Sequence, residues 1–193
     1  APTISSMTVG ALTDLANELA FADDTVVLHF NVAVAPNRGY INFVKITDDT
    51  VFCRAEVHDT TKVLTDTTGK VAILGCNDGA GVSATLTALE YRIEVEAGAF
   101  VTRGTKDITN DRWLGFGYKN NFLTTSDTFT VAASPTDRAP TVVFTSRSAE
   151  DAYQPITVVW SRKVTQQNGN ACTLNTQSTT AVATTGSDRV FTV

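Results

Sequence analysis

Oxygen-bearing side chains gather in one polar stretch of the sequence, and they are of the kind that binds calcium. Asp107, Asn110 and Asp111 lie in the run 102–112, which holds a single glycine, Gly104. Calcium takes about six to eight oxygen ligands, often from several loops, but the spacing here does not match an EF-hand. The competing interpretation is that these residues cap strand ends in turns. Calcium is the one cofactor that the sequence suggests, and we otherwise expect no cofactor or metal.

Three aromatic residues follow in the next segment: Trp113, Phe116 and Tyr118. Aromatic rings presented by a β-sandwich can recognise sugars by stacking, helped by a few hydrogen bonds. If the segment is a strand, however, Trp113 points to the opposite face from Phe116 and Tyr118, and one of the two faces belongs to the core. Glycan binding and core packing therefore both stay open for these rings.

Signatures of catalysis are missing from the sequence. It contains no Gly-x-Ser-x-Gly, no His-Glu-x-x-His and no glycine-rich phosphate loop with its lysine. His58 stands beside Asp59, but neither a nucleophile nor the oxyanion donors of a triad can be recognised near this pair. We therefore expect that the protein is not an enzyme.

Two of the three cysteines are expected to form a disulfide. Cys53 lies on the apolar face of the alternating segment 51–57, and Cys76 closes the next apolar run, which starts at Val71. Segments that are adjacent in sequence usually lie side by side in a sheet. The alternative is that both are buried thiols, packed as small apolar side chains.

The third cysteine, Cys172, is left over. An odd cysteine in an extracellular chain indicates a bridge to another chain, a partner in a part of the protein beyond this sequence, or a free thiol. All three interpretations stay open. The first of them makes Cys172 a candidate for an interchain joint.

The segments that must carry these residues are β-strands. Apolar residues make up 42% of the 193 residues and charged residues only 18%, and they form short alternating runs between Gly, Asn and Asp turns. The cleanest alternation puts Tyr91, Ile93, Val95 and Ala97 on one face, with charged residues between them. Only 11–21 has helix-like spacing, enough for one or two turns. We expect strands at 4–9, 25–34, 40–46, 51–57, 71–74, 91–97, 113–118 and 128–132, which predicts a β-sandwich.

Two stretches of the chain begin alike. Residues 1–4, Ala-Pro-Thr-Ile, are echoed by residues 139–142, Ala-Pro-Thr-Val. The pattern predicts tandem modules, one over 1–138 and an incomplete second one over 139–193. Each beginning leads into an apolar row, formed by Val26, Leu28, Phe30, Val32 and Val34 in the first copy and by Ile156, Val158, Trp160 and Val164, interrupted by Arg162, in the second.

These rows resemble a known family. Residues 30–34, Phe-Asn-Val-Ala-Val, and 160–164, Trp-Ser-Arg-Lys-Val, are similar to the Phe-Ser-x-x-Val strand of bacterial Ig-like domains of surface-layer and adhesin proteins. Residues 89–100 resemble the later Leu…Tyr-x-Val-x-Ile…Gly-Ala-Phe element of that family, although 102–112 lacks its usual Asp-x-x-Gly-Asn loop. The resemblance implies an Ig-like sandwich with a repeated scaffold role outside the cell, and it carries no catalytic residues.

Charge and hydropathy exclude two classes of partner. The net charge is −5, and lysines and arginines are scattered without a basic run, so we expect no nucleic-acid partner. No apolar stretch is long enough for a spanning helix, so we expect no membrane insertion. The chain opens on Ala1 rather than Met, which suggests that it was processed or excised from something longer.

The incomplete second module motivates the functional hypothesis. If it holds only part of its strands, then Ile156, Val158 and Trp160 lack the sheet that buries the equivalent row in the first copy. An exposed apolar face and open strand edges favour pairing with another chain. We therefore expect a structural subunit of an extracellular or cell-surface fibre, filament or layer that self-associates through 139–193 into a homopolymer. The alternative function is an adhesin module that recognises glycan, with or without calcium.

Overall fold

Every regular element in the described part of the chain is a β-strand. The computed structural model describes residues 1–107, 112–114, 124–146, 157–164, 172–174, 177–179, 182–183 and 189–192. Within these ranges no helix occurs, which confirms the all-β prediction. The segment 11–21, for which helical turns were expected, forms turns that include one bond from the Glu18 N–H to the Asp14 carbonyl at 2.9 Å.

Two sheets face each other around the main core. The seven-stranded sheet has the order β10-β9-β6-β5-β11-β15-β2, and the middle sheet has the order β1-β3-β8-β7. The bounds of the first sheet are β10 Ser83–Ala84, β9 Cys76–Asn77, β6 Thr50–Glu56, β5 Tyr40–Lys45, β11 Glu90–Val95, β15 Thr124–Val131 and β2 Leu19–Ala20. Those of the middle sheet are β1 Ile4–Val9, β3 Val26–Phe30, β8 Lys70–Ile73 and β7 Val63–Thr65.

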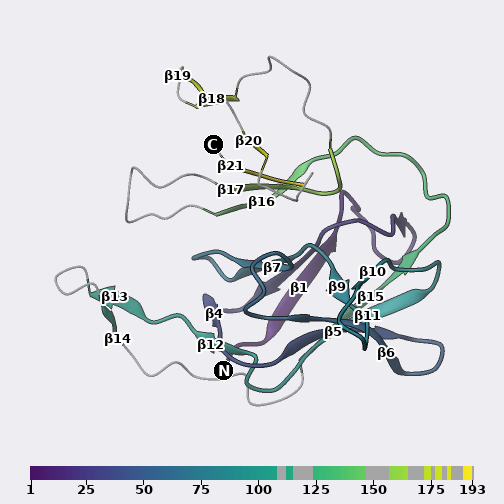
Figure 1. Cartoon of the computed structure of the whole chain (residues 1–193), viewed down its shortest axis with the longest axis horizontal. Coiled ribbons are helices and arrows are strands. Elements are labelled where there is room, and N and C mark those ends of the chain that lie inside the picture. Colours follow the sequence, from purple (N-terminus) through teal and green to yellow (C-terminus); the bar gives the residue numbers. More distant parts are fainter. Residues whose placement is uncertain are drawn as a thin grey trace.

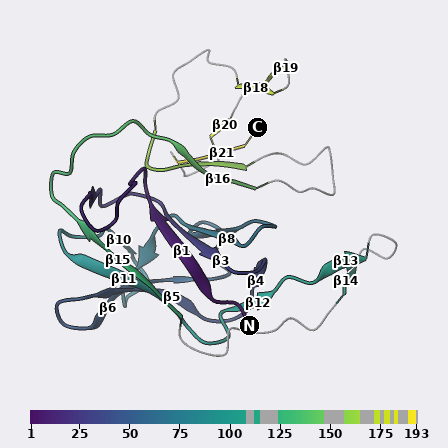
Figure 2. The same cartoon turned by 180° about the vertical axis from the view of Figure 1, so that it is seen from behind.

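A third layer lies on the middle sheet. This outer sheet has the order β16-β17-β21-β20, with bounds Val142–Ser146, Thr157–Trp160, Val190–Thr192 and Val182–Ala183. Figure 1 shows it above the middle sheet, on the side opposite the seven-stranded sheet. The chain reaches it by a long connection that loops round one side of the molecule after β15 (Figures 1 and 2).

Three two-stranded pairs complete the described elements. They are β12 Phe100–Thr102 with β4 Val34–Pro36, β13 Thr105–Asp107 with β14 Arg112–Leu114, and β18 Cys172–Leu174 with β19 Gln177–Thr179. The β13–β14 pair projects from the sandwich, as both ribbon views show.

Strand β11 shows how alternation builds the core. Tyr91, Ile93 and Val95 are each 0% exposed, as the alternation predicted, and the strand pairs antiparallel with both β5 and β15. Ala97, which the same alternation placed on this face, lies beyond the end of β11 and is exposed, so its predicted place in the row is wrong. Tyr91 is fully buried, so its hydroxyl needs a partner. It donates to the Thr87 carbonyl at 3.2 Å and accepts from the Thr87 N–H at 3.2 Å.

The predicted long strand 25–34 is broken in the structure. It ends at Phe30, and the chain bends through 31–33 before β4 begins at Val34. Leu28 and Val34 lie in the main core as predicted, but Val32 is 38% exposed, so its predicted place in the apolar row is wrong. The bend has a physical role because it lets β4 leave the middle sheet and pair with β12.

The hairpins β1–β3 and β16–β17 share one irregularity. In the first, Ile4 pairs with Phe30 and the register shifts immediately afterwards. In the second, Val142 pairs with Trp160 and the register shifts at the same place. A register shift of this kind adds a residue to one strand and increases the local twist. The two hairpins therefore have the same strand geometry at their entry.

The same two hairpins also share a hydrogen-bond pair. The Asn31 N–H donates to the Thr3 carbonyl at 3.0 Å, and the Ser161 N–H donates to the Thr141 carbonyl at 2.7 Å. In return, the Thr3 N–H donates to Asn31 Oδ1 at 2.9 Å, and the Thr141 N–H donates to Ser161 Oγ at 3.0 Å. Both hairpins thus close with a reciprocal pair in which the return acceptor is a side-chain oxygen.

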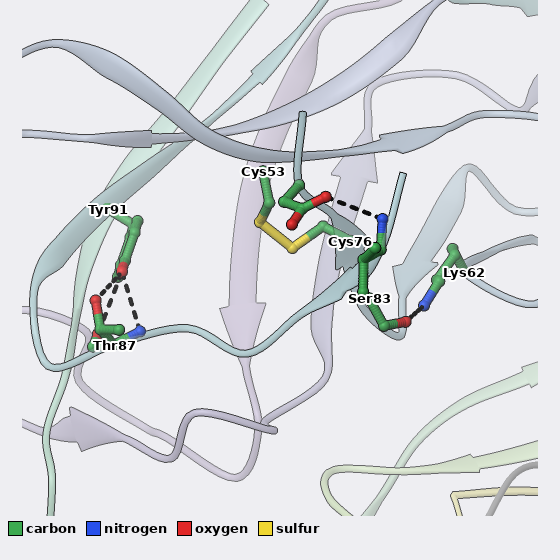
Figure 3. The surroundings of a disulfide bond; sticks show 8 residues. Cys53, Lys62, Cys76, Ser83, Thr87 and Tyr91 are labelled. Carbon is green, nitrogen blue, oxygen red and sulfur yellow. Dashed lines mark hydrogen bonds between the residues drawn. A yellow bond between two sulfur atoms is a disulfide. The ribbon is translucent and has the colours of Figure 1, made fainter. Parts of the chain in front are cut away.

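A disulfide joins Cys53 of β6 to Cys76 of β9, as the sequence predicted, and Figure 3 shows its surroundings. Both residues are 2% exposed and belong to the main core. Close by, the Lys62 ammonium donates to Ser83 Oγ at 2.5 Å, which ties the start of β10 to the turn before β7. The covalent bond therefore secures the end of the seven-stranded sheet where the paired strands are shortest.

Removing this disulfide should destabilise the sandwich. The bond spans a sequence separation of 23 residues. On the chain-entropy model, a double variant Cys53→Ala/Cys76→Ala should lose about 3 kcal/mol of unfolding free energy. This loss is measured by urea denaturation, with tryptophan fluorescence as the signal of unfolding. Reductant should lower the stability of the wild type by a similar amount and leave the double variant unchanged; equal stability of all samples would contradict the prediction.

Candidate functional site: the joint between the middle and outer sheets

The outer sheet is held to the middle sheet by a second apolar cluster, separate from the main core. Val27 of β3 and Ala72 of β8 contribute from the middle sheet. Phe144, Val159 and Val190 contribute from the outer sheet, and all five residues are at most 6% exposed. We call this contact between the two sheets the joint. It gives β3 and β8 apolar neighbours on both faces.

Thr25, the residue before β3, is the polar centre of the joint. Its N–H donates to the Ser161 carbonyl at 2.7 Å, and its hydroxyl donates to the Trp160 carbonyl at 2.8 Å. Its own carbonyl accepts from the Gly10 N–H at 2.8 Å. Because Thr25 is 0% exposed, each of these groups would otherwise be buried without a partner, at a cost of about 1–3 kcal/mol each.

Arg189 adds a cation from the other side of the joint. It is 6% exposed, and its Nη1 donates to Thr25 Oγ1 at 3.3 Å and to the Leu74 carbonyl at 3.0 Å. A guanidinium presents donors in a fixed planar fork, so these bonds set direction as well as distance. Arg189 therefore fixes the start of β21 on the end of β8.

The rim of the joint carries ion pairs from the connection between the two parts. Arg162 Nη2 lies 2.6 Å from Asp137 Oδ1, and its guanidinium carbon lies 4.6 Å from the centre of the Phe21 ring. Arg138 Nη2 lies 3.4 Å from Glu18 Oε1. These groups are partly solvated, and exposed pairs of this kind contribute little energy. They set orientation rather than affinity.

Asp24 lies beneath the rim, in a tight fit. Gly10 has φ +52°, and a Cβ on it would lie 2.4 Å from Asp24 Cγ, so only glycine fits there. Burial raises the pKa of the Asp24 carboxyl, although the Phe21 N–H, which donates to Oδ2 at 2.9 Å, works in the opposite direction. Asp23 raises this pKa further, and Arg162 lowers it. The folded state therefore favours the protonated form of Asp24 relative to the unfolded chain.

An open cavity of about 670 Å³ lies beside the joint. Residues of all three sheets and of their connections line it, and the charges in its wall are of both signs. The charged side chains are Asp23, Asp24, Lys62, Lys163 and Arg189. Leu86 and Cys76 are among its apolar lining residues. The cavity is thus a consequence of how the outer sheet sits on the sandwich.

The structure places the predicted assembly residues on the other face of the outer sheet. Trp160 and Val158 are only partly buried and are absent from both apolar clusters, whereas their neighbour Val159 is 0% exposed and packs in the joint. The row predicted to face a partner sheet is therefore not the row that packs in this chain. Ile156 lies outside the described residues.

Four of the other predicted site residues fall outside the described part of the chain. Phe116 and Tyr118 of the aromatic set lie there, as do Asn110 and Asp111 of the calcium set. For Trp113, Asp107 and Cys172 the structure gives the backbone, in β14, β13 and β18, and does not describe the side chains. In the ranges that are described, no three His, Cys, Asp or Glu side chains gather as metal ligands.

Comparisons with known proteins return no relative. No family model, no curated protein and no solved structure matches the chain. Among the described residues there is also no helix with the length and apolar character needed to cross a membrane.

Runs of consecutive apolar residues in the sequence indicate the joint, and an interpretation based on alternating rows alone misses them. Residues 26–28 are three consecutive apolar residues, and so are 158–160. A strand with one face in water alternates, whereas a strand covered on both faces reads as a continuous apolar run. Val27 and Val159 are the residues of these runs that break the alternation, and both are 0% exposed in the joint.

Replacing Thr25 should loosen the outer sheet. Thr25→Val keeps the shape of the side chain but leaves the partly buried Trp160 carbonyl without its donor, which should cost about 1 kcal/mol or more. Amide hydrogen exchange in β16 and β17 should accelerate accordingly. Thr8→Val, at an exposed position of the neighbouring strand β1, is the matched control and should leave those rates unchanged. Equal protection in the two variants would contradict the role of Thr25.

Asp24 should make stability depend on pH. Its raised folded-state pKa contributes stability that is fully present below the ordinary value of 3.8 and is lost as the pH rises through the folded pKa. Asp24→Asn keeps an oxygen acceptor for the Phe21 N–H and removes the buried charge. The variant should gain stability over the wild type at pH 7, and the gain should shrink toward pH 3.5. Urea titrations at several pH values test this; a gain independent of pH would refute it.

Proposed function

We propose that the protein is a structural subunit of an extracellular or cell-surface assembly, built from tandem Ig-like modules, that associates with itself through 139–193. The observation that carries this proposal is the second hairpin. β16–β17 has the register shift of β1–β3 and the same reciprocal bond pair, Asn31 with Thr3 in one and Ser161 with Thr141 in the other. Repeated modules are typical of stalks, fibres and layers.

The buried tyrosine supports the Ig-like part of the proposal. In Ig-like sandwiches a tyrosine near the start of a late strand donates its hydroxyl to the backbone a few residues upstream. Tyr91 is the second residue of β11, and its hydroxyl donates to the carbonyl of Thr87, four residues before it. The two facing sheets supply the matching architecture.

The disulfide supports the location. Disulfides form and persist in oxidising surroundings such as the cell exterior, and they are rare in the cytosol. Cys53 and Cys76 are both buried, so their bond serves stability rather than redox chemistry. A stable, loop-rich sandwich outside the cell fits a scaffold role.

Electron microscopy of the purified chain tests the proposal. At high protein concentration the wild type should form filaments or ordered layers in negative stain. If Cys172 bridges chains, Cys172→Ser should shorten or abolish these assemblies. Unchanged filaments of Cys172→Ser would mean that the chains associate through another contact, and the proposed assembly would stand. Dispersed single particles of the wild type across concentrations and redox conditions would overturn the proposed function.

A further inference from the structure

We propose that the joint is itself the contact through which copies associate: the β16–β17–β21 face of one chain docks on the middle sheet of a second chain. The proposal rests on the proposed function and specifies the surfaces that assemble. Within one chain the joint already shows both surfaces in place, with Val27 and Ala72 as the acceptor and Phe144, Val159 and Val190 as the donor. An identical element exchanged between copies is a low-cost route to association.

The acceptor surface is built for one kind of occupant. It is apolar at Val27 and Ala72, and at its end it presents the Thr25 N–H and the Leu74 carbonyl. The outer sheet satisfies both polar groups, with the Ser161 carbonyl at 2.7 Å and Arg189 Nη1 at 3.0 Å. A generic apolar partner would bury those groups without bonds, and a buried polar group without a partner is costly. The surface therefore selects the outer sheet of this chain, whichever copy supplies it.

The connection between donor and sandwich allows the exchange. The Ala132 N–H still donates to the Ala20 carbonyl at 3.1 Å, and contacts resume at Asp137, which pairs with Arg162. Between them, residues 133–136 take part in no hydrogen bond or ion pair in the structure, and three of the four are exposed. This hinge can open without breaking a hydrogen bond or an ion pair of its own. Every contact of the closed joint can then form again between two chains.

The contact would propagate because its two surfaces differ. The donor lies on β16, β17 and β21, and the acceptor on β3 and β8, so a chain that gives its donor to one neighbour leaves its acceptor for another. Such a heterologous contact builds rings where the rotation closes and filaments where it does not. The protein concentration decides the balance between the closed monomer and the exchanged assembly. Within one chain the tether gives the donor an effective concentration in the millimolar range, with which other chains must compete.

Two complementary variants test the exchange. Val27→Asp places a charge on the acceptor and Val159→Asp places one on the donor, at positions that are both 0% exposed. Val27 belongs to the joint cluster and not to the main core, so the sandwich should stay folded. Each variant alone should elute as a monomer in size-exclusion chromatography with light scattering. A one-to-one mixture should contain a heterodimer, because the intact donor of Val27→Asp fits the intact acceptor of Val159→Asp. No larger species should form, because the remaining donor and acceptor both carry a charge.

Controls separate this result from a general effect of added charge. Val82→Asp, at a residue that is 61% exposed and outside the joint, should assemble as the wild type does, because its donor and its acceptor are both intact. A mixture of Val27→Asp and Val159→Asp that stays monomeric would overturn the exchange. Wild-type filaments together with a monomeric mixture would overturn it while leaving the proposed assembly in place. A heterodimer without wild-type filaments would support the exchange and count against the assembly alone.

A second variant keeps the proposal testable where a charged one unfolds. Deleting residues 133–136 joins the end of the sandwich directly to Asp137 and strains the closed form. Shortened hinges favour exchange between chains. The deletion variant should shift from monomer to dimers or larger species at equal concentration, with the outer sheet still protected from protease. A monomer, whether its outer sheet is protected or digested, would overturn the proposal.

Discussion

The structure depends on one constraint: the two inner strands of the middle sheet, β3 and β8, are covered on both faces, whereas the edge strand β1 keeps Ser6 and Thr8 exposed. Leu28 of β3 packs in the main core and Val27, the next residue back, packs in the joint, and both are 0% exposed. In β8, Val71 and Ala72 divide in the same way. Strands of this kind have no face left for water, so both coverings must form before β3 and β8 are fully buried. Loss of the outer sheet would expose Val27 and Ala72 together.

Burial on both faces moves the polar chemistry of the joint to the ends of the strands. The backbone groups within β3 and β8 are used by their own ladder. At the ends, Thr25 and Leu74 have groups that the ladder does not use, and the outer sheet supplies Ser161 and Arg189 as their partners. Apolar contact supplies most of the affinity in such an arrangement, whereas the few buried bonds decide which surface fits, because an unmatched buried group is costly. In the joint, the hydrogen bonds at the strand ends therefore supply specificity, and the apolar contact between the strands supplies affinity.

The fold was predictable from the sequence where one face of a strand meets the core. The alternation at Tyr91 and Ile93 identified β11, and the spacing of Cys53 and Cys76 in neighbouring strands identified the disulfide. The joint was not predicted, because alternation assigns one face of each strand and treats the other as solvated. Val159 was therefore passed over in favour of Trp160. The break of the strand after Phe30 depends on the pairing of β4 with β12, which no local pattern contains.

The two similar hairpins bury opposite faces, and this difference follows from what covers them. Phe30 and Trp160 hold the same place beside the register shift. Phe30 is 5% exposed beneath the seven-stranded sheet, whereas Trp160 is only partly buried and it is Val159, on the other face, that packs in the joint. Equal strand geometry with unequal burial means that register is set locally, by the hydrogen bonds at Asn31 and Ser161, and burial is set by the neighbouring layer. A hairpin of this type can therefore serve as the wall of its own sandwich or as the cover of another without a change in its internal pairing.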